Sequence, residues 1–292
     1  MHVDRYAPSP TSDLHLGNLR TALAGWLLAR TAGGRWLMRV EDLDEPRVRA
    51  AGDAERRNLD DVRRLGLDWD GEVIRQSERH DDYRDAIASL GDRVFECFCT
   101  RRELASAASA PHGDDGFRPY PGTCLRLTDR ERKERRAERR PALRVRADGA
   151  TWRVHDRFAG EVEATVDDFV LVRGDGQFAY NLAAVVDDIA TGVTHITRGD
   201  DLLSSAPRQA WLTAQLGGTP ASYTHVSLVM GTDGHRLAKR KGGITLDEAG
   251  GPKTVFPWLA RSLGLGPCRD SAEALSRMPA DYEFWTSRIS IT

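Results

Sequence analysis

Lysine is scarce in this chain: among 42 basic residues only Lys133, Lys239, Lys241 and Lys253 are lysines, and the rest are arginines. Long apolar runs are also missing, since no stretch approaches the roughly 18 residues that a membrane-spanning helix needs. The N-terminus has no basic segment followed by an apolar one, so no secretory leader is expected and the cytoplasm is the predicted location. No internal repeat or sustained heptad is present, which excludes solenoids and coiled coils.

Neither sign of charge is in large excess. The formal net charge is −2, which argues against indiscriminate binding of nucleic acids but allows a local basic face. With 292 residues, of which 40% are hydrophobic and 29% charged, the chain can bury a full core and is neither fibrous nor disordered. The length predicts one large domain with an insertion, or two modest domains.

Strands and helices alternate through the first ninety residues. Short apolar segments at 3–7 and 35–40 predict strands, and an apolar, helix-period segment at 17–31 predicts the helix between them. The spacing of Leu, Val, Ala and Ile among charges predicts two more helices at 53–65 and 79–90. This alternation predicts a parallel α/β sheet with ligands at the carboxyl ends of its strands.

The pattern changes near residue 95. Residues 95–168 contain cysteines, a Gly/Ala/Ser/Pro-rich loop, a highly charged helix at 128–140 and short alternating strands, which predicts an insertion between the two halves of the sheet. The α/β alternation is predicted to resume with a strand at 169–172. The later predicted elements are helices at 181–190, 206–216 and 254–263 and a strand at 194–197.

The first strand-to-helix crossing carries the densest chemistry, in a run that reads RYAPSPTSDLHLGN from Arg5 to Asn18. Two prolines end the strand in an extended turn. The free N–H groups and the dipole of the following helix attract an anion, and Gly17 lets a ligand approach the backbone. His15 can donate a hydrogen bond to a phosphoryl oxygen. We therefore expect a phosphate over the first turn of this helix.

This run resembles the first signature of the class I aminoacyl-tRNA synthetases, and specifically their glutamate branch. The resemblance implies ATP-dependent activation of an amino acid on a Rossmann-type parallel sheet, with Arg5 and Ser9 facing the amino acid. His15 would be catalytic and would bind ATP together with the Gly17-Asn18 pair. Ser12 and Asp13 depart from the signature, where the family commonly has glycine and one further residue, and we expect only a local change in the turn.

Two later segments resemble the same branch: YNLAAVVDD, which begins at Tyr180, and GVTHITRGDDLLSS, which contains Arg198. In the family, this tyrosine and this arginine line the amino-acid pocket. Glutamate has two carboxylates and one ammonium, so its pocket needs about two arginines and one anionic group, and arginine matches carboxylates in a bidentate geometry that lysine lacks. Arg5 and Arg198 would supply the cations, and Glu41, at the carboxyl end of a strand, would take the α-ammonium. Ser9 and Tyr180 offer hydroxyl groups.

A third segment, GTDGHRLAKRKGG at 231–243, resembles the second class I signature, a mobile basic loop. The resemblance aligns Lys239 with the position that meets the triphosphate as pyrophosphate leaves, and implies catalytic and ATP-binding roles. A compact ammonium there stabilises charge that grows in the transition state. The scarcity of lysine favours this interpretation over an ordinary solvated loop. Ala238 replaces the usual serine, which puts the family's hydroxyl contact at this point in question.

Three cysteines, Cys97, Cys99 and Cys124, lie within 28 residues of sequence. Disulfides are not expected in the cytoplasm, so a metal is preferred over three reduced thiols. Zinc takes four ligands, and either Tyr120 or His112 can complete the set. The C-x-C…Y-x3-C arrangement resembles one group within the family, in which tyrosine is the fourth ligand. We predict one structural Zn²⁺ per chain that holds the insertion together, with Cys268 outside the site.

Residues 3–245 as a whole resemble the truncated branch of the family, the glutamyl-queuosine tRNA(Asp) synthetases. Full glutamyl-tRNA synthetases continue well beyond the basic loop into a helical anticodon-reading region, whereas this chain has only a short tail. The resemblance implies that L-glutamate is activated by ATP with Mg²⁺, without tRNA, and then esterified to the queuosine base in the anticodon loop of tRNA(Asp). No membrane partner is expected, and a monomer is predicted.

The predicted organisation has four segments. Residues 1–95 and 169–228 would form the two halves of the nucleotide-binding domain, 96–168 a zinc-containing α+β insertion, and 229–292 the basic loop and a short helical region. Residues 130–146 are interpreted as a solvated helix with alternating charges, with an RNA-binding face as the alternative.

Two other functions stay open from the sequence. One is a catalytic fragment of a glutamyl-tRNA synthetase that charges a tRNA 3′ end, against which the short tail and Tyr120 argue. The other is a non-catalytic nucleotide-binding paralogue, against which the presence of Arg5, Glu41 and Lys239 argues.

Overall fold

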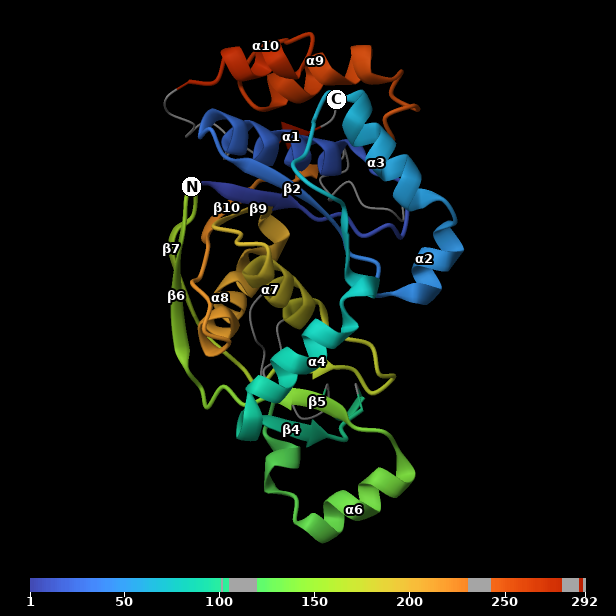
Figure 1. The fold of residues 1–292 in the computed structure, drawn as a ribbon, viewed down its shortest axis with the longest axis vertical. Coiled ribbons are helices and arrows are strands. Elements are labelled where there is room, and N and C mark those ends of the chain that lie inside the picture. Colours follow the sequence, from blue (N-terminus) through green and yellow to red (C-terminus); the bar gives the residue numbers. More distant parts are fainter. Residues whose placement is uncertain (101, 105–119, 231–242, 280–288, 291–292) are drawn as a thin grey trace.

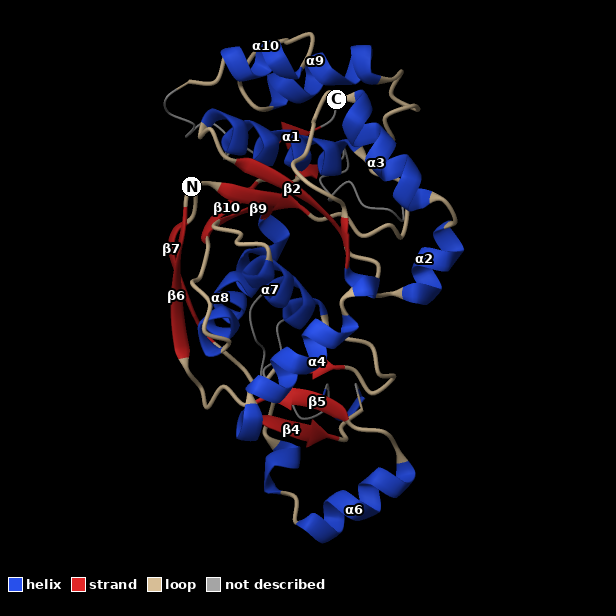
Figure 2. Ribbon diagram, viewed as in Figure 1, coloured by secondary structure: helices blue, strands red, loops and turns tan. Residues whose placement is uncertain are grey.

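The computed structural model describes residues 1–100, 102–104, 120–230, 243–279 and 289–290. Two sheets form a layer through the molecule (Figures 1 and 2). The first is parallel and has the order β1-β2-β3, with β1 at Val3–Tyr6, β2 at Arg35–Val40 and β3 at Ile74–Arg75. The second has the order β7-β6-β10-β9, with β6 at Thr151–Asp156, β7 at Gly160–Thr165, β9 at His195–Gly199 and β10 at Ser222–Val226.

β1 and β9 join the two sheets edge to edge. The amide of Thr194 donates to the carbonyl oxygen of Val3 at 2.9 Å, and the amide of Thr197 donates to the Asp4 carboxylate at 3.2 Å. Both strands therefore run in the same direction, and β9 and β6 are each parallel to β10. The predicted parallel α/β sheet is confirmed. The carboxyl ends of β1, β2 and β9 meet at one edge, the ligand-binding edge of such sheets.

Helix α1 (Leu16–Thr31) lies on one face of this layer, and α9 (Pro252–Ser262) and α10 (Ser271–Ser276) pack over it (Figure 1). Because α1 is covered by strands on one side and by α9 on the other, its buried residues run around the helix. Arg20 of α1 is buried too, and it donates to the carbonyl oxygens of Ser227 at 2.7 Å and Ser262 at 3.2 Å. This buried guanidinium ties α1 to α9 and to the segment after β10.

The opposite face of the layer is covered by α7 (Tyr180–Ala190) and α8 (Ala206–Gln215), with α4 (His80–Ser89) beside α7. These helices share a core around Leu182 and Trp211, to which Val145 and Leu171 also belong. Two further helices, α2 (Glu45–Ala51) and α3 (Ala54–Arg64), follow β2 at the side of the molecule (Figure 1).

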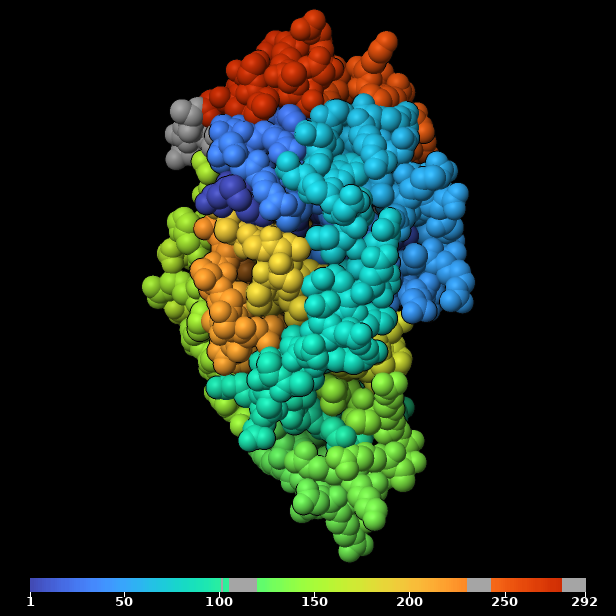
Figure 3. Space-filling model, viewed as in Figure 1, coloured from blue at the N-terminus to red at the C-terminus, as the bar shows by residue number. Residues whose placement is uncertain are grey.

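The insertion contains an antiparallel sheet of order β4-β5-β8, at Val94–Cys97, Ala142–Val145 and Val170–Val172, and the exposed helix α6 (Asp129–Glu138). It forms the narrow end of the molecule in Figure 3, where this part is green. The observed strand pairing differs from two sequence-based expectations in this part of the chain. The strand predicted to resume the α/β layer is β8, which pairs antiparallel with β5 instead. The β6–β7 hairpin, expected inside the insertion, joins the main layer because Val154 and Val162 pack against its core.

The remaining elements are short. The pair β11 (Val229–Met230) and β12 (Ile289–Ser290) is parallel, and the 3-10 helices are η1 (Gln76–Glu78), η2 (Gly91–Arg93), η3 (Thr123–Arg126) and η4 (Asp200–Ser205). Within the described part of the chain, no helix has the length and apolar character needed to cross a membrane.

Candidate active site

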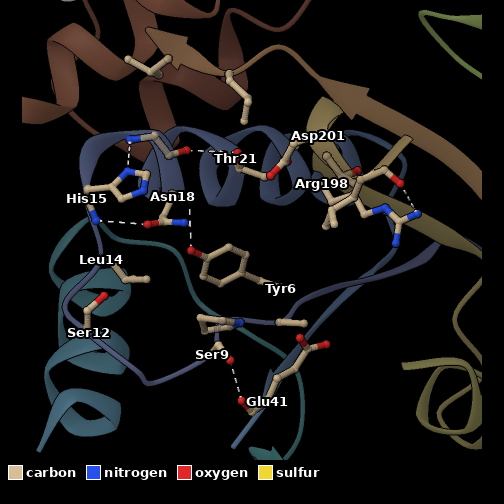
Figure 4. A pocket seen from close by; sticks show the side chains of 18 of the residues that line it. Tyr6, Ser9, Ser12, Leu14, His15, Asn18, Thr21, Glu41, Arg198 and Asp201 are labelled. Carbon is tan, nitrogen blue, oxygen red and sulfur yellow. Dashed lines mark hydrogen bonds between the residues drawn. The ribbon is translucent and has the colours of Figure 1, made fainter. Parts of the chain in front are cut away.

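A cleft of about 630 Å³ lies at the carboxyl ends of β1, β2 and β9, beside the first turn of α1 (Figure 4). Every predicted glutamate or ATP residue that the structure describes lines this cleft. These residues are Arg5, Ser9, His15, Gly17, Asn18, Glu41, Tyr180 and Arg198. The fold thus brings together side chains that are nearly 200 residues apart in sequence.

His15 is the N-cap of α1, and its ring is held by the helix it caps. Its Nδ1 accepts a hydrogen bond from the amide of Gly17 at 3.1 Å, while the side chain of Asn18 accepts from the amide of His15 at 3.2 Å (Figure 4). Because Nδ1 accepts, the neutral ring carries its proton on Nε2. That nitrogen is a donor, which suits a phosphoryl oxygen at a helix N-terminus.

Gly17 leaves room for the His15 ring. A Cβ atom at this position would lie 3.0 Å from Cε1 and 3.1 Å from Nδ1 of His15, closer than side-chain carbons normally approach. Any larger residue would therefore push the imidazole away from the amide that orients it.

Arg5 and Glu41 belong to one buried ionic network. Arg5 Nε lies 3.1 Å from Asp188 Oδ1, and the same carboxylate oxygen accepts a hydrogen bond from Arg39. Arg39 also donates to Glu41 Oε1 at 3.1 Å. Burial raises the pKa of Glu41, although Arg39 and Arg5 act against it. Burial alone would also raise the pKa of Asp188, but Arg39 and Arg5 outweigh it and hold that pKa below its ordinary value.

Arg198 is held without an opposite charge. Its guanidinium donates to Gln209 at 2.6 Å, to the carbonyl oxygen of Leu202 at 3.1 Å, to Tyr180 at 3.4 Å and to His225 at 2.9 Å. Among the described residues, no carboxylate oxygen lies within ion-pair distance of it. Arg198 therefore presents a buried, uncompensated positive charge at the cleft, which favours an anionic ligand.

Two departures from the family signature, Ser12 and Asp13, lie in a turn that α3 stabilises. The side chain of Asn58 donates to the carbonyl oxygen of Ser12 and accepts from the amide of Leu14, both at 3.1 Å. Arg57 pairs with Asp13 at 2.7 Å. The turn is thus fixed by contacts of its own, and both residues line the cleft without disturbing the cap at His15.

The predicted basic loop, including Ala238 and Lys239, lies outside the described residues. The segments that flank it are described, and both reach the N-terminus of α1. On one side, Val229 lies 3.7 Å from the position of a Cβ atom on Gly17. On the other, the carbonyl oxygen of Ile244 accepts from the amide of Leu16 at 3.0 Å.

The three cysteines of the insertion converge. The Sγ atoms of Cys97, Cys99 and Cys124 lie within 4.8 Å of one another, and those of Cys99 and Cys124 are 3.6 Å apart. Thiolates on a tetrahedral zinc ion lie about 3.8 Å apart, so the spacing fits such an ion. The hydroxyl of Tyr120 accepts from the amide of Cys124 at 2.7 Å, and Tyr120 packs against the small cluster that contains Cys97 and Cys124. His112 lies outside the described residues.

Cys268 is buried in the main core with Phe256 and Leu263, in a different hydrophobic cluster from the three cysteines. It lies outside the cluster of the three cysteines, as the sequence analysis expected.

Four residues of the site were missed by the sequence analysis: Arg39, Asp188, Gln209 and His225. Asp188 stands in a segment that had already been singled out, so the need of a buried arginine for a counter-ion could have identified it. Nothing in the sequence pattern around Gln209 and His225 signals that both accept hydrogen bonds from Arg198.

The family model described as tRNA synthetases class I (E and Q), catalytic domain, matches residues 2–257. Three similar curated proteins are named glutamyl-Q tRNA(Asp) synthetase. The protein of Nocardia farcinica is 54% identical over 90% of this chain and 85% of its own length. The protein of Cutibacterium acnes is 52% identical over 94% of this chain and 79% of its own length. The protein of Symbiobacterium thermophilum is 45% identical over 91% of this chain and 87% of its own length.

Solved structures show a similar fold. A glutamate tRNA ligase from Elizabethkingia meningosepticum, crystallised with its amino acid, matches with a TM-score of 0.79 at 23% identity. The match covers 100% of this chain and 67% of the ligase chain. The glutamate-tRNA synthetase of Elizabethkingia anophelis gives a TM-score of 0.80 at 23% identity, with coverage of 100% and 68%. At this identity the likeness concerns the fold.

Proposed function

The chain belongs to the class I tRNA synthetase family for glutamate and glutamine, and on that basis we propose that it activates glutamate with ATP and transfers it to queuosine in tRNA(Asp). As a member of this family it is an enzyme, a ligase. The observation that carries the acceptor assignment is the 54% identity, over 90% of the chain, to a protein named glutamyl-Q tRNA(Asp) synthetase.

The cleft offers an opposite charge for each charged group of glutamate. Arg5 and Arg198 would each hold one of the two carboxylates, and Glu41 would accept the α-ammonium. Burial of the carboxyl group raises the pKa of Glu41. A bound ammonium would stabilise the anion and offset that burial. Ser9, which donates to the carbonyl oxygen of Glu41 at 2.8 Å, would fix this loop beside the substrate.

ATP, as its Mg²⁺ complex, would lie with its phosphates over the first turn of α1. His15 would donate from Nε2 to a phosphoryl oxygen, and the backbone at Gly17 and Asn18 would offer close approach and the positive end of the helix dipole. A glutamate carboxylate oxygen forms a bond to the α-phosphorus, and the bond from that phosphorus to the pyrophosphate oxygen breaks. Lys239 would stabilise the leaving pyrophosphate.

In the second step, a ring hydroxyl of queuosine attacks the carbonyl carbon of glutamyl-adenylate, loses its proton and displaces AMP. No protein nucleophile is required, so catalysis would rest on positioning and electrostatics. A structural zinc ion would be held by Cys97, Cys99 and Cys124 with Tyr120, and it would stabilise the insertion without taking part in the reaction.

Pyrophosphate exchange tests the first step. We expect glutamate-dependent exchange between labelled pyrophosphate and ATP in the absence of tRNA. Glutamine should be disfavoured by about 2–4 kcal/mol, since it would leave an arginine of the pocket without a carboxylate. Equal exchange with glutamine or aspartate would contradict the glutamate assignment.

Labelled glutamate tests the second step. Incubation with ATP and queuosine-containing tRNA(Asp) should label the RNA, while unmodified tRNA(Asp) should stay unlabelled. Label on a 3′ end instead would identify the enzyme as one that charges tRNA like an ordinary glutamyl-tRNA synthetase. The absence of both exchange and transfer would identify a non-catalytic paralogue.

A further inference from the structure

The arginine that presents an uncompensated charge to the cleft depends on a buried histidine. Arg198 is only 5% exposed, and its Nε donates to Nε2 of His225 at 2.9 Å. Gln209, Leu202 and Tyr180 accept from its two terminal nitrogens. His225 is therefore the partner that fixes Nε and with it the plane of the guanidinium.

One proton arrangement of His225 fits this contact. Nε2 must accept from Arg198, so the neutral ring carries its proton on Nδ1. Nδ1 lies 2.7 Å from Oδ2 of Asp156, and that oxygen also accepts from the amide of His225 at 3.0 Å. His225 and Asp156 have side chains that are 1% and 0% exposed. Asp156 thus selects the tautomer that Arg198 requires.

Asp156 is itself held in place. Its other oxygen, Oδ1, accepts from the amides of Phe158 at 3.0 Å and Ala159 at 2.8 Å, in the turn between β6 and β7. This hairpin lies between β5 and β8 in the sequence but pairs with β10, the strand that carries His225. The parallel pairing of β6 with β10 brings Asp156 to the ring, and the pairing of β10 with β9 brings His225 opposite Arg198.

The surroundings of the ring exclude its other states. A second proton on His225 would place a cation against Arg198 and remove the acceptor of Nε. In the other tautomer, the N–H group at Nε2 of His225 would face the N–H group at Nε of Arg198. The charged neighbours that act on the ring are Asp156 from β6, Arg198 from β9 and Asp200 from η4, and Tyr223 stacks on it at 5.8 Å.

We propose that His225, with its tautomer fixed by Asp156, is a positioning residue for glutamate binding: it aligns Arg198 without neutralising it. A carboxylate in its place would align Arg198 equally well but would cancel the charge that the substrate needs. A neutral acceptor keeps that charge available to a carboxylate of glutamate. This inference rests on the proposed function for its assay, while the proton arrangement itself can be measured without one.

Two isosteric variants separate alignment from packing. In His225→Gln, the amide oxygen takes the place of Nε2 and still accepts from Arg198. In His225→Asn, the amide nitrogen takes the place of Nδ1 and reaches Asp156, but no atom replaces Nε2. We expect the glutamate KM in pyrophosphate exchange to rise about tenfold or more in H225N and to stay within about threefold of the parent in H225Q, with the ATP KM unchanged in both.

The chain offers a matched control, His155→Asn. His155 also pairs with a carboxylate through Nδ1, with Glu161 at 2.8 Å, but the pair is exposed and lies on the face of β6 opposite to the buried Asp156. H155N should leave every kinetic constant unchanged. Asp156→Asn gives a second route, because its amide nitrogen would donate to Nδ1, move the ring proton to Nε2 and cause the same loss of glutamate affinity. Thermal unfolding of each variant checks that it is folded.

The tautomer can be read directly in the unmodified enzyme. Long-range ¹H–¹⁵N correlation spectra should show His225 neutral with its proton on Nδ1, at a pH where exposed histidines titrate. A proton on Nε2, or an equal rise in glutamate KM for H225Q and H225N, would overturn the inference. An enzyme without any glutamate-dependent exchange would instead refute the proposed function, and the spectrum would still decide the proton arrangement.

Discussion

Asp4 is a carboxyl group with no exposed surface, at the junction of β1 and β9. It accepts hydrogen bonds from the amide of Arg5 at 2.7 Å and the hydroxyl of Thr197 at 2.6 Å. Burial raises the pKa of Asp4 from 3.8 to about 6, although Arg5 and Thr197 act against it. The folded protein therefore binds this proton more tightly than the unfolded chain does. The contribution of Asp4 to stability is fully present below about pH 4 and is lost as the pH rises to about 6.

Replacement of Asp4 by asparagine should remove this pH dependence. The shift of about two pKa units corresponds to at most about 3 kcal/mol of unfolding free energy between pH 4 and pH 7. Urea unfolding at several pH values, for the parent and for Asp4→Asn, measures the difference between the two curves. Groups such as Asp188 act equally on both proteins and cancel. Parallel curves would mean that Asp4 is ionised to the same extent in the folded and unfolded chains.

Lys239 gives a kinetic prediction at the same scale. If it stabilises the triphosphate mainly as pyrophosphate leaves, Lys239→Ala should lower kcat for adenylate formation by about 10²–10³-fold, with a smaller effect on the ATP KM. Transfer from preformed glutamyl-adenylate should be nearly unchanged, because no triphosphate remains at that stage. Single-turnover measurements separate the two steps. An equal loss in both would place Lys239 in the support of the fold or of the RNA.

At the scale of elements, we predict that the insertion depends on its cysteine cluster. It buries a small core of its own around Cys97, Phe98 and Cys124, away from the main layer. A metal ion that joins strand β4 to η3 would therefore stabilise this part most. We expect close to one zinc per chain by metal analysis, and Cys99→Ser should lose it.

The same variant should unfold the insertion before the layer of two sheets that contains β1. Hydrogen exchange in β4 and β5 should accelerate in Cys99→Ser, while exchange in β1 and α1 stays close to that of the parent. Cys268→Ser is the matched control, since Cys268 lies in the main core and should not affect zinc. A chain purified without chelators that is folded and metal-free would contradict the zinc prediction.

Helical periodicity predicted α3, α4, α7, α8 and α9 to within two residues at each end, because each has an apolar stripe that faces a core. The sequence analysis missed α2, which has no buried residue. It also missed β10, because the buried polar residues Thr224 and His225 interrupt the apolar pattern that indicates a buried strand. The pairing of β6 with β10 could not be predicted either. It joins segments about seventy residues apart, and periodicity carries no information on which strands become neighbours.

For the candidate site, too, local sequence motifs could be identified and long-range contacts could not. Residues inside contiguous motifs, such as Arg5 and His15, could be identified from the sequence by resemblance, and the fold places them in one cleft. Their roles remain predictions. The fold brings Asp188 to Arg5, and it brings Gln209 and His225 to Arg198, in each case from a different element. Only the three-dimensional arrangement therefore identifies these three residues.

At the scale of the whole molecule, we predict a monomer. Among the residues that the structure describes, Met1 is the large hydrophobic side chain that is exposed, and large exposed apolar patches are the usual mark of a self-association surface. Sedimentation equilibrium should therefore give a mass near 32.4 kDa over a wide range of protein concentration. A mass near twice that value at micromolar concentration would contradict this prediction.

The junction of β1 with β9 also bears on how the protein is made. Val3 bonds to Thr194, 191 residues later in the chain. At about 5–20 residues per second, a ribosome needs about 10–40 s to deliver the neighbour of the first strand. During that time β1, β2 and β3 can form only a sheet with a bare edge, which is prone to pair with other chains. The nascent protein should therefore depend on chaperones during synthesis, and a slower ribosome should lengthen that dependence.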